Sequence, residues 1–190
     1  MAARTLTFVS SNEEKFHEIR DAVAASGVTL VRLSLDLPEI QSIDPAEVAG
    51  YKAQRAYEIL GTAVLVEDTG LALTAWNGYP GALIKWVLKA VSEEGLCRQL
   101  DAWSDRSATA TVVLCLHDGQ TQHCFTGTTD GAITLHPRGT FGFGWDSIFQ
   151  PAGSDLTYGE MPREAKMQIS MRARAVAGLS SHLLTSTSRA

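Results

Sequence analysis

Residues 5–26, "TLTFVSSNEEKFHEIRDAVAAS", decide the fold class. The segment starts as an apolar strand over residues 5–10 and passes through small polar residues into a helix over 12–26. Phe16, Ile19 and Val23 share one face of that helix. A second apolar strand is predicted over residues 28–34. Strand, helix and strand in alternation predict an α/β protein with a mixed sheet.

The junction of this strand and helix has two interpretations. Asn12 is a good N-cap, and the two acids after it suit the first turn of a helix. Small residues at such a junction also leave backbone N–H groups free to face an anion, with Lys15 adding positive charge. The local sequence leaves both interpretations open.

The later part of the chain continues the alternation and then changes to a hairpin. "DPAE" at residues 44–47 combines a capping Asp, a Pro at the first helical position and an acid three residues after the cap. Further elements follow from periodicity and turn residues. They are a helix to about residue 60, short strands "AVLVED" and "LALTA", helices over 83–91 and 93–103, a hairpin of 108–117 with 121–129, a third antiparallel strand in "GAITLH", and a closing helix over 163–184.

Composition limits the possible partners. The chain has 190 residues, 45% of them hydrophobic, which is enough for one compact domain over residues 1–190 or for two lobes that share a sheet. A formal net charge of −5 gives no long-range attraction to nucleic acid or anionic membrane, so neither is expected as a partner. No signal peptide or apolar run of ~20 residues is present, which predicts a soluble protein.

The cysteines and histidines suggest no metal site. Cys97, Cys115 and Cys124 lack C-x-x-C spacing, and we expect them to be reduced thiols in a cytosolic protein. His117 and His123 flank the hairpin turn and are expected to face solvent.

Three carboxylates are candidates for a metal site. Asp68 and Glu67 stand where an apolar strand is expected to end, in "VEDTG", and Glu39 lies in a proline-containing loop. Carboxylates that converge without His or Cys suit a hard cation, above all Mg²⁺. The alternative is that the adjacent acids simply end a strand in solvent.

Lysines and aromatic residues complete a candidate nucleotide pocket. Lys15, Lys52 and Lys85 could bind a polyphosphate, although single lysines are usually solvated, and no Walker sequence is present. In "FGFGWD" at residues 141–146, two aromatic rings and an Asp could stack on a base and bind its edge, or the segment could be a tight turn. In "EAKMQISMRARA" at residues 164–175, Lys166, Ser170 and Arg172 form either a basic helix face or a cluster of donors.

Six separated motifs then carry a family resemblance. "SSNEEKF", "DLPEIQ", "VEDTGLALTAWNGYPGALIKW", "FGFGWDSIFQP", "TYGEMP" and "KMQISMRARA" resemble, in order and spacing, the inosine triphosphate pyrophosphatase family, also called Ham1-like non-canonical purine NTP pyrophosphatases. The resemblance covers residues 8–183.

The resemblance implies a fold and an activity. The fold would be an elongated mixed β-sheet flanked by helices, in two lobes with the active-site cleft between them. The enzyme would hydrolyse ITP, dITP and XTP to the monophosphate and pyrophosphate with Mg²⁺, or Mn²⁺ as a substitute. It would be a cytoplasmic homodimer that sanitises the nucleotide pool.

The resemblance also assigns residues. Asp68 would be catalytic and would hold the metal with Glu39. The residues that would contact substrate are Ser10, Asn12, Lys15, Lys52, Glu67, Thr69, Lys85, Phe143, Gly144, Trp145, Asp146, Lys166, Ser170, Met171 and Arg172.

Two positions depart from the family pattern, and two rivals stay open. Ser11 stands where the family usually has Gly, and Met171 stands where it commonly has His, so the phosphate loop and the base contacts could differ. The rivals are a Maf-like pyrophosphatase of other nucleotides and a non-catalytic nucleotide-binding module.

Overall fold

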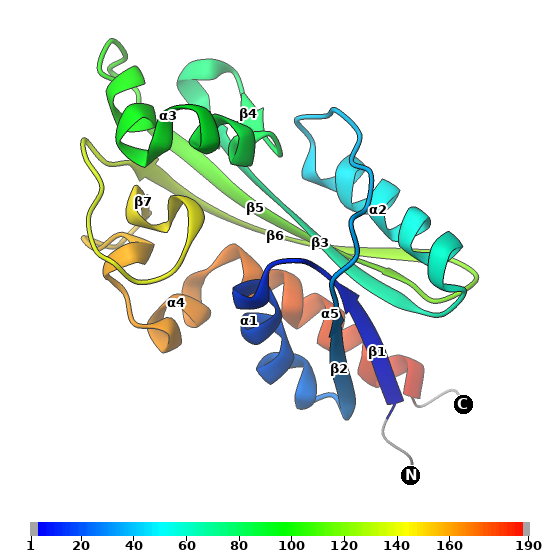
Figure 1. Ribbon diagram of the computed structural model, residues 1–190. Helices are drawn as coiled ribbons and strands as arrows, with labels where there is room; N and C mark the ends of the chain where they lie inside the picture. Colours follow the sequence, from blue (N-terminus) through cyan, green and yellow to red (C-terminus); the bar gives the residue numbers. More distant parts are fainter. Residues whose placement is uncertain (1–3, 188–190) are drawn as a thin grey trace.

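The protein is described by a computed structural model that covers residues 4–187, and its centre is one mixed sheet (Figure 1). The sheet has seven strands in the order β2-β1-β3-β5-β6-β7, with β4 paired to β3. β1 is parallel to β2 and β3, and the later pairs are antiparallel. The strands are β1 Arg4–Val9, β2 Val28–Leu33, β3 Val64–Leu73, β4 Pro80–Gly81, β5 Ser107–His117, β6 Gln122–Ile133 and β7 Phe149–Pro151.

Helices cover both faces of this sheet (Figure 1). α2 packs its alanines on one face, in a cluster with Val66 and Val113, while α1 and α5 cover the other face. The helices are α1 Glu13–Ala24, α2 Pro45–Leu60, α3 Ile84–Gln99, α4 Arg163–Ile169 and α5 Met171–Thr187, with 3₁₀ turns η1 Thr74–Trp76, η2 Gly144–Ser147 and η3 Tyr158–Glu160. The predicted α/β class is confirmed, and so are β1, α1, β2 and α2 within one or two residues at each end.

The strand that carries Asp68 does not end there, and this prediction was wrong. "AVLVED" and "LALTA" are parts of one strand, β3, whose pairing with β5 runs without interruption from Val64 to Leu73. Gly70 is needed for close packing, because a Cβ there would lie 2.5 Å from Pro45 Cγ and 3.0 Å from the Gly81 carbonyl carbon. Asp68 therefore sits inside a rigid strand.

The third antiparallel strand was also placed wrongly. "GAI" of "GAITLH" belongs to β6, and the strand that pairs with it is β7, residues Phe149–Pro151. Gly131 again permits close approach, since a Cβ there would lie 2.3 Å from the Gln150 carbonyl oxygen. The predicted third strand was thus placed at Gly131, where β6 continues and β7 packs closely against it.

The helix boundaries bear out one prediction and overturn another. α3 is interrupted at Ser92 (φ 63°, ψ 177°), which confirms separate helices over 83–91 and 93–103, although the second ends at Gln99. The closing helix is instead two helices, because Ser170 is extended (φ −75°, ψ 154°) between α4 and α5. The Ser170 hydroxyl accepts a hydrogen bond from the Ala173 N–H at 3.2 Å, so this serine caps α5.

Two predictions about side chains in the hairpin were wrong. Cys115 and Cys124 are directly opposite in the β5–β6 register and form a disulfide, so only Cys97, which is buried, is a free thiol among the described residues. His117 is buried and stacks on Tyr57 at 4.0 Å between ring centroids. Within residues 4–187, no helix has the length and apolar character needed to cross a membrane.

Candidate active site

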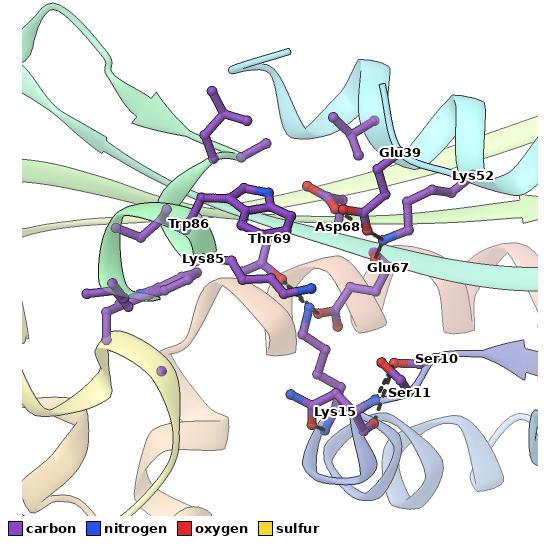
Figure 2. A pocket seen from close by; sticks show the side chains of 18 of the residues that line it. Ser10, Ser11, Lys15, Glu39, Lys52, Glu67, Asp68, Thr69, Lys85 and Trp86 are labelled. Atoms are coloured by element: carbon purple, nitrogen blue, oxygen red, sulfur yellow. Dashed lines mark hydrogen bonds and ion pairs between the residues drawn. The ribbon is translucent and has the colours of Figure 1, made fainter. Parts of the chain in front are cut away.

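A cavity of about 1140 Å³ lies where β3, the three flanking helices α1, α2 and α3, and the η2 turn meet (Figure 2). Chain segments far apart in sequence form its walls. The predicted residues that line it are Ser10, Asn12, Lys15, Glu39, Lys52, Glu67, Asp68, Thr69, Lys85, Phe143, Gly144, Trp145, Asp146, Met171 and Arg172. Two predicted residues, Lys166 and Ser170, are absent from that lining.

Two carboxylates meet one lysine on the α2 side of β3. Lys52 Nζ lies 3.0 Å from Glu39 Oε1 and 3.2 Å from Asp68 Oδ1, and it also donates to the Glu67 carbonyl at 3.1 Å. The second carboxylate oxygen of Asp68, Oδ2, is buried and has no hydrogen-bond partner among the described residues. Asp68 therefore retains an unused acceptor beside the cavity.

The pKa values in this group reflect burial and opposite charge. Burial raises the pKa of Asp68, and the nearby Lys52 and Lys15 offset only part of that rise, so the pKa lies above 3.8. Burial would also raise the pKa of Glu39, but Lys52 outweighs it and the pKa is lowered. Burial would lower the pKa of Lys52, but Asp68 and Glu39 raise it, so Lys52 stays charged.

Glu67 points to the opposite face of β3, as strand alternation requires. Its Oε1 lies 3.0 Å from Lys15 Nζ, which also donates to Thr69 Oγ1 at 2.9 Å. Arg172 grips both oxygens of Glu67, through Nε at 2.8 Å and Nη2 at 3.0 Å. Burial would raise the pKa of Glu67, but Arg172 and Lys15 lower it far below its usual range. Glu67 thus holds two cations in place.

The deep end of the cavity is a buried network of charges under an aromatic ring. Glu18 accepts from Arg172 Nη1, and it lies 3.1 Å from Lys166 Nζ. Lys166 Nζ is also 2.7 Å from Asp146 Oδ2, the oxygen that accepts the Phe143 N–H at 2.8 Å. Both Lys166 and Arg172 lie against the Phe143 ring, at 4.9 Å and 5.5 Å from its centroid.

This network leaves some donors of the cavity-lining residues without an acceptor. Arg172 has five N–H groups, and three of its nitrogens already donate to carboxylates, which leaves N–H groups for a ligand. Trp145 Nε1–H is buried and has no acceptor among residues 4–187. An occupant with oxygen acceptors would pair with donors that the protein itself does not use.

The loop between β1 and α1 confirms the capping interpretation, and anion binding by this loop stays a prediction. Asn12 caps α1 by accepting the Lys15 N–H at 3.1 Å, and Ser10 Oγ accepts the Asn12 N–H at 3.2 Å. The same residues line the cavity. Ser11 is not among the described residues with a positive φ, so the serine fits this loop without backbone strain.

Sequence reasoning missed Glu18, which is buried and joins Lys166 to Arg172. The signal was an acid beside Ile19 on the buried side of α1, where a charge is costly unless it is paired. It also missed Trp86 and Lys89, which line the cavity from α3. Lys166 does not line the cavity but donates a hydrogen bond to Asp146, which does, whereas Ser170 caps α5.

Comparison with known proteins gives a consistent result. The family model described as "Ham1 family" matches residues 6–182. A curated protein of Batrachochytrium dendrobatidis named inosine triphosphate pyrophosphatase is 43% identical over 176 residues, which are 92% of this chain and 91% of that protein. A protein of the same name from Tuber melanosporum is 45% identical over 176 residues, 91% of this chain and 93% of that protein.

Solved structures agree with the observed fold. The structure of a HAM1 protein from Coxiella burnetii has a TM-score of 0.84 at 26% identity and covers 95% of this chain and 98% of its own. The crystal structure named nucleoside-triphosphatase or dITP/XTP pyrophosphatase from Mycobacterium abscessus has a TM-score of 0.73 at 30% identity, covering 92% and 98%.

Proposed function

The chain belongs to the Ham1 family, and from this premise we propose that it hydrolyses non-canonical purine nucleoside triphosphates, such as ITP, dITP and XTP, to the monophosphate and pyrophosphate. The observation that carries the proposal is the cavity itself. One end has converging carboxylates and lysines, and the other has an aromatic platform with unused donors. A phosphate chain requires the cations at the first end, and a purine with oxygen acceptors requires the aromatic ring and donors at the second.

A Mg²⁺ ion fits the carboxylate end. The carboxylates of Glu39 and Asp68 converge, since both lie within ion-pair distance of Lys52 Nζ. Asp68 Oδ2 is a buried oxygen that lacks a hydrogen-bond partner among the described residues. The described residues contain no group of three His, Cys, Asp or Glu side chains suited to a metal. Two carboxylates are nonetheless sufficient for Mg²⁺, which usually keeps several waters and takes its other ligands from substrate phosphates. When bound, the ion would neutralise phosphate charge and favour ionisation of a bound water.

The lysines and the β1–α1 loop would hold the triphosphate. Lys15 and Lys85 line the cavity, and the Lys85 ammonium has no carboxylate partner among residues 4–187. Asp68 would accept a proton from the attacking water. The water oxygen bonds to the α phosphorus, the bond to the α–β bridging oxygen breaks, and pyrophosphate leaves with its charge balanced by the lysines.

The base end would read the purine through oxygen. Hypoxanthine and xanthine carry an acceptor at position 6, where adenine carries an amino donor. Free N–H groups of Arg172 and the unpaired Trp145 Nε1–H would remain unpaired opposite adenine. An unpaired buried donor costs ~1–3 kcal/mol, which is about a tenfold to hundredfold preference for each lost bond.

Product analysis tests this function directly. The experiment measures pyrophosphate and orthophosphate separately from ITP, XTP, dITP, GTP, ATP and UTP, with and without Mg²⁺. We expect the first three to give pyrophosphate, only with the metal, and much faster than ATP, which lacks the acceptor at position 6. Orthophosphate as the first product would contradict cleavage at the α–β bond, and binding of ITP without turnover would leave only a nucleotide-binding module.

Two further properties remain proposals. We propose a homodimer, supported by the exposed Val31 and Leu33 on the edge strand β2, and light scattering would measure its mass. A cytoplasmic location also stays a prediction, and the Cys115–Cys124 bond counts against it because disulfides are uncommon in reducing compartments. Alkylating the thiols rapidly in intact cells and counting the free ones would show whether Cys115 and Cys124 are bonded there, and so whether the protein occupies a reducing compartment.

A further inference from the structure

The first two turns of α3 place an exposed indole at the cavity. Trp86 lines the cavity with 55% of its surface exposed, although tryptophan is usually well buried. Figure 2 shows its indole extending from α3 over the cavity toward Glu39, on the side opposite Ser10 and Lys15. The proposed triphosphate site does not use this ring.

Two ammonium groups flank the indole. Lys85 Nζ and Lys89 Nζ each lie 5.5 Å from the centroid of the Trp86 ring. In the described part of the chain, neither ammonium has a carboxylate within ion-pair distance. Glu93 is four residues after Lys89, but the break at Ser92 lies between them and the usual helical pairing is not formed.

Charge and shape together define what could occupy this place. An aromatic ring beside cations that lack a carboxylate partner is an arrangement by which proteins stack a base and hold its phosphates, and here the Trp86 ring is itself the cation–π partner of Lys85 and Lys89. The cavity, at about 1140 Å³, is larger than the ~300–1,000 Å³ typical of small-molecule sites. With Lys85 engaged by the triphosphate, Trp86 and Lys89 remain for a group beyond the third phosphate.

We propose that Trp86 and Lys89 form a distal subsite that binds the second nucleoside of a dinucleoside polyphosphate. This inference rests on the proposed function, because the first purine must occupy the Phe143 end. The second base stacks on the indole, and the Lys89 ammonium pairs with the last phosphate of the bridge. The enzyme then acts on nucleotides with a longer leaving group as well as on simple triphosphates.

The chemistry is the same hydrolysis with another leaving group. Water attacks the α phosphorus on the inosine side, and the α–β bridging oxygen departs with the remaining phosphates and the second nucleoside. One proton passes from water to Asp68 and then to solvent. Inosine-adenosine tetraphosphate and one water therefore give IMP and ATP, and no other reactant is needed.

The test uses this mixed dinucleotide, because its product ATP is measured by luciferase light. We compare it with ITP and with inosine 5′-tetraphosphate, which has the same phosphates without the second nucleoside. Trp86→Ala should raise KM for the dinucleotide about tenfold or more, Lys89→Gln should raise it several-fold, and Trp86→Phe should restore most of the loss. KM for ITP should change less than twofold in all three variants. KM for inosine tetraphosphate should change less than twofold in the two Trp86 variants and should rise several-fold in Lys89→Gln, because its fourth phosphate pairs with Lys89 as the dinucleotide's does. Trp103→Ala, which removes a 48% exposed tryptophan outside the cavity, is the matched control.

The outcomes separate the subsite from the proposed function. If ITP is hydrolysed but the dinucleotide is not, or if Trp86→Ala weakens ITP and dinucleotide equally, the subsite is rejected and the pyrophosphatase stands. If no nucleotide is hydrolysed, calorimetry still decides the subsite. The dinucleotide must then bind about tenfold tighter than inosine tetraphosphate, and Trp86→Ala must abolish that difference.

Discussion

At the scale of single residues, the two acids in "VED" have different tasks because a strand points them to opposite faces. Asp68 faces α2 and shares Lys52 with Glu39, whereas Glu67 is enclosed by Lys15 and Arg172. The raised pKa of Asp68 and the lowered pKa of Glu67 follow from those surroundings. Asp68 is thus suited to accept a proton, and Glu67 to remain charged.

Asp68→Asn should leave a folded protein that binds nucleotide but has lost more than nine-tenths of kcat, because Asn removes the charge and the proton acceptor without changing volume. In the protein without bound metal, the Asp68 carboxyl should titrate above the ordinary aspartate value of 3.8, since burial raises its pKa. Steady-state kinetics measures the loss of kcat, and NMR titration of the metal-free protein measures the direction of the pKa shift. Retention of more than a tenth of kcat would show that Asp68 is not the central carboxylate.

Arg172 is a poor target for alanine scanning. Arg172→Ala would remove one of the two cations that each of the buried Glu18 and Glu67 contacts, leaving only Lys166 and Lys15, and we expect it to lower the free energy of unfolding by ~3–5 kcal/mol. Urea titration measures that loss.

The selectivity for ITP over ATP is tested with a milder change. Arg172→Lys keeps the charge but has fewer donors, so it should reduce this selectivity. Met171→Ala should change the selectivity less than tenfold. Unchanged selectivity in Arg172→Lys would argue against base reading by this residue.

At the scale of elements, breaks in helices decide where side chains reach the site. Ser170 ends α4 and caps α5, so that Met171 and Arg172 begin a new helix at the cavity. Ser92 divides α3 in the same way, and its backbone has φ and ψ angles that residues other than glycine rarely adopt. The helix before Ser92 supplies Lys85, Trp86 and Lys89 to the cavity, and the helix after it supplies Leu96 and Cys97 to the core.

Substitutions at Ser92 should follow the order of stability Gly above Ser above Ala. Glycine relieves the positive φ, for a gain of about 1 kcal/mol, whereas alanine keeps the strain and loses the hydroxyl that accepts the Gly95 N–H at 3.4 Å. Thermal unfolding of the three proteins gives the order. Equal stability of the Gly and Ala variants would mean that φ costs nothing here.

The disulfide should contribute modestly to stability. Cys115 and Cys124 enclose a short hairpin turn, and a loop of this length corresponds to ~2–3 kcal/mol of restricted unfolded-chain entropy. Reduction should therefore lower Tm by several degrees, and Cys124→Ser should match the reduced protein. When the oxidised protein is denatured, one thiol, that of Cys97, should react with a thiol reagent, and three thiols should react after reduction. Three thiols without a reductant would contradict the bond.

At the scale of the whole molecule, a chain of buried ion pairs connects the two ends of the sequence. Glu18 of α1, Glu67 of β3, Asp146 of η2 and Arg172 of α5 belong to one network that also includes Lys166. The free energy of the network depends on keeping every carboxylate ionised.

Stability should consequently fall in acid through Glu67. Its folded pKa is lower than the ordinary 4.5, so its contribution is fully present above about that pH and is lost as the pH falls through the lower folded value. Glu67→Gln should be much less stable than wild type at pH 7, and the difference should shrink toward pH 2. A difference that stays constant over this range would exclude Glu67 as the group responsible.

The sequence by itself determined the α/β class, the capped helices α1 and α2, the break in α3 and, through the family motifs, many of the residues that line the cavity. These features depend on periodicity, capping and motif spacing, which are patterns among residues close together in the sequence. Tertiary structure alone decided that β3 passes through Asp68, that Gly70 and Gly131 permit close packing, that Cys115 faces Cys124, and that Glu18 joins the site. Each of these depends on contact between segments distant in the chain, and no local pattern reports which side chains will meet there.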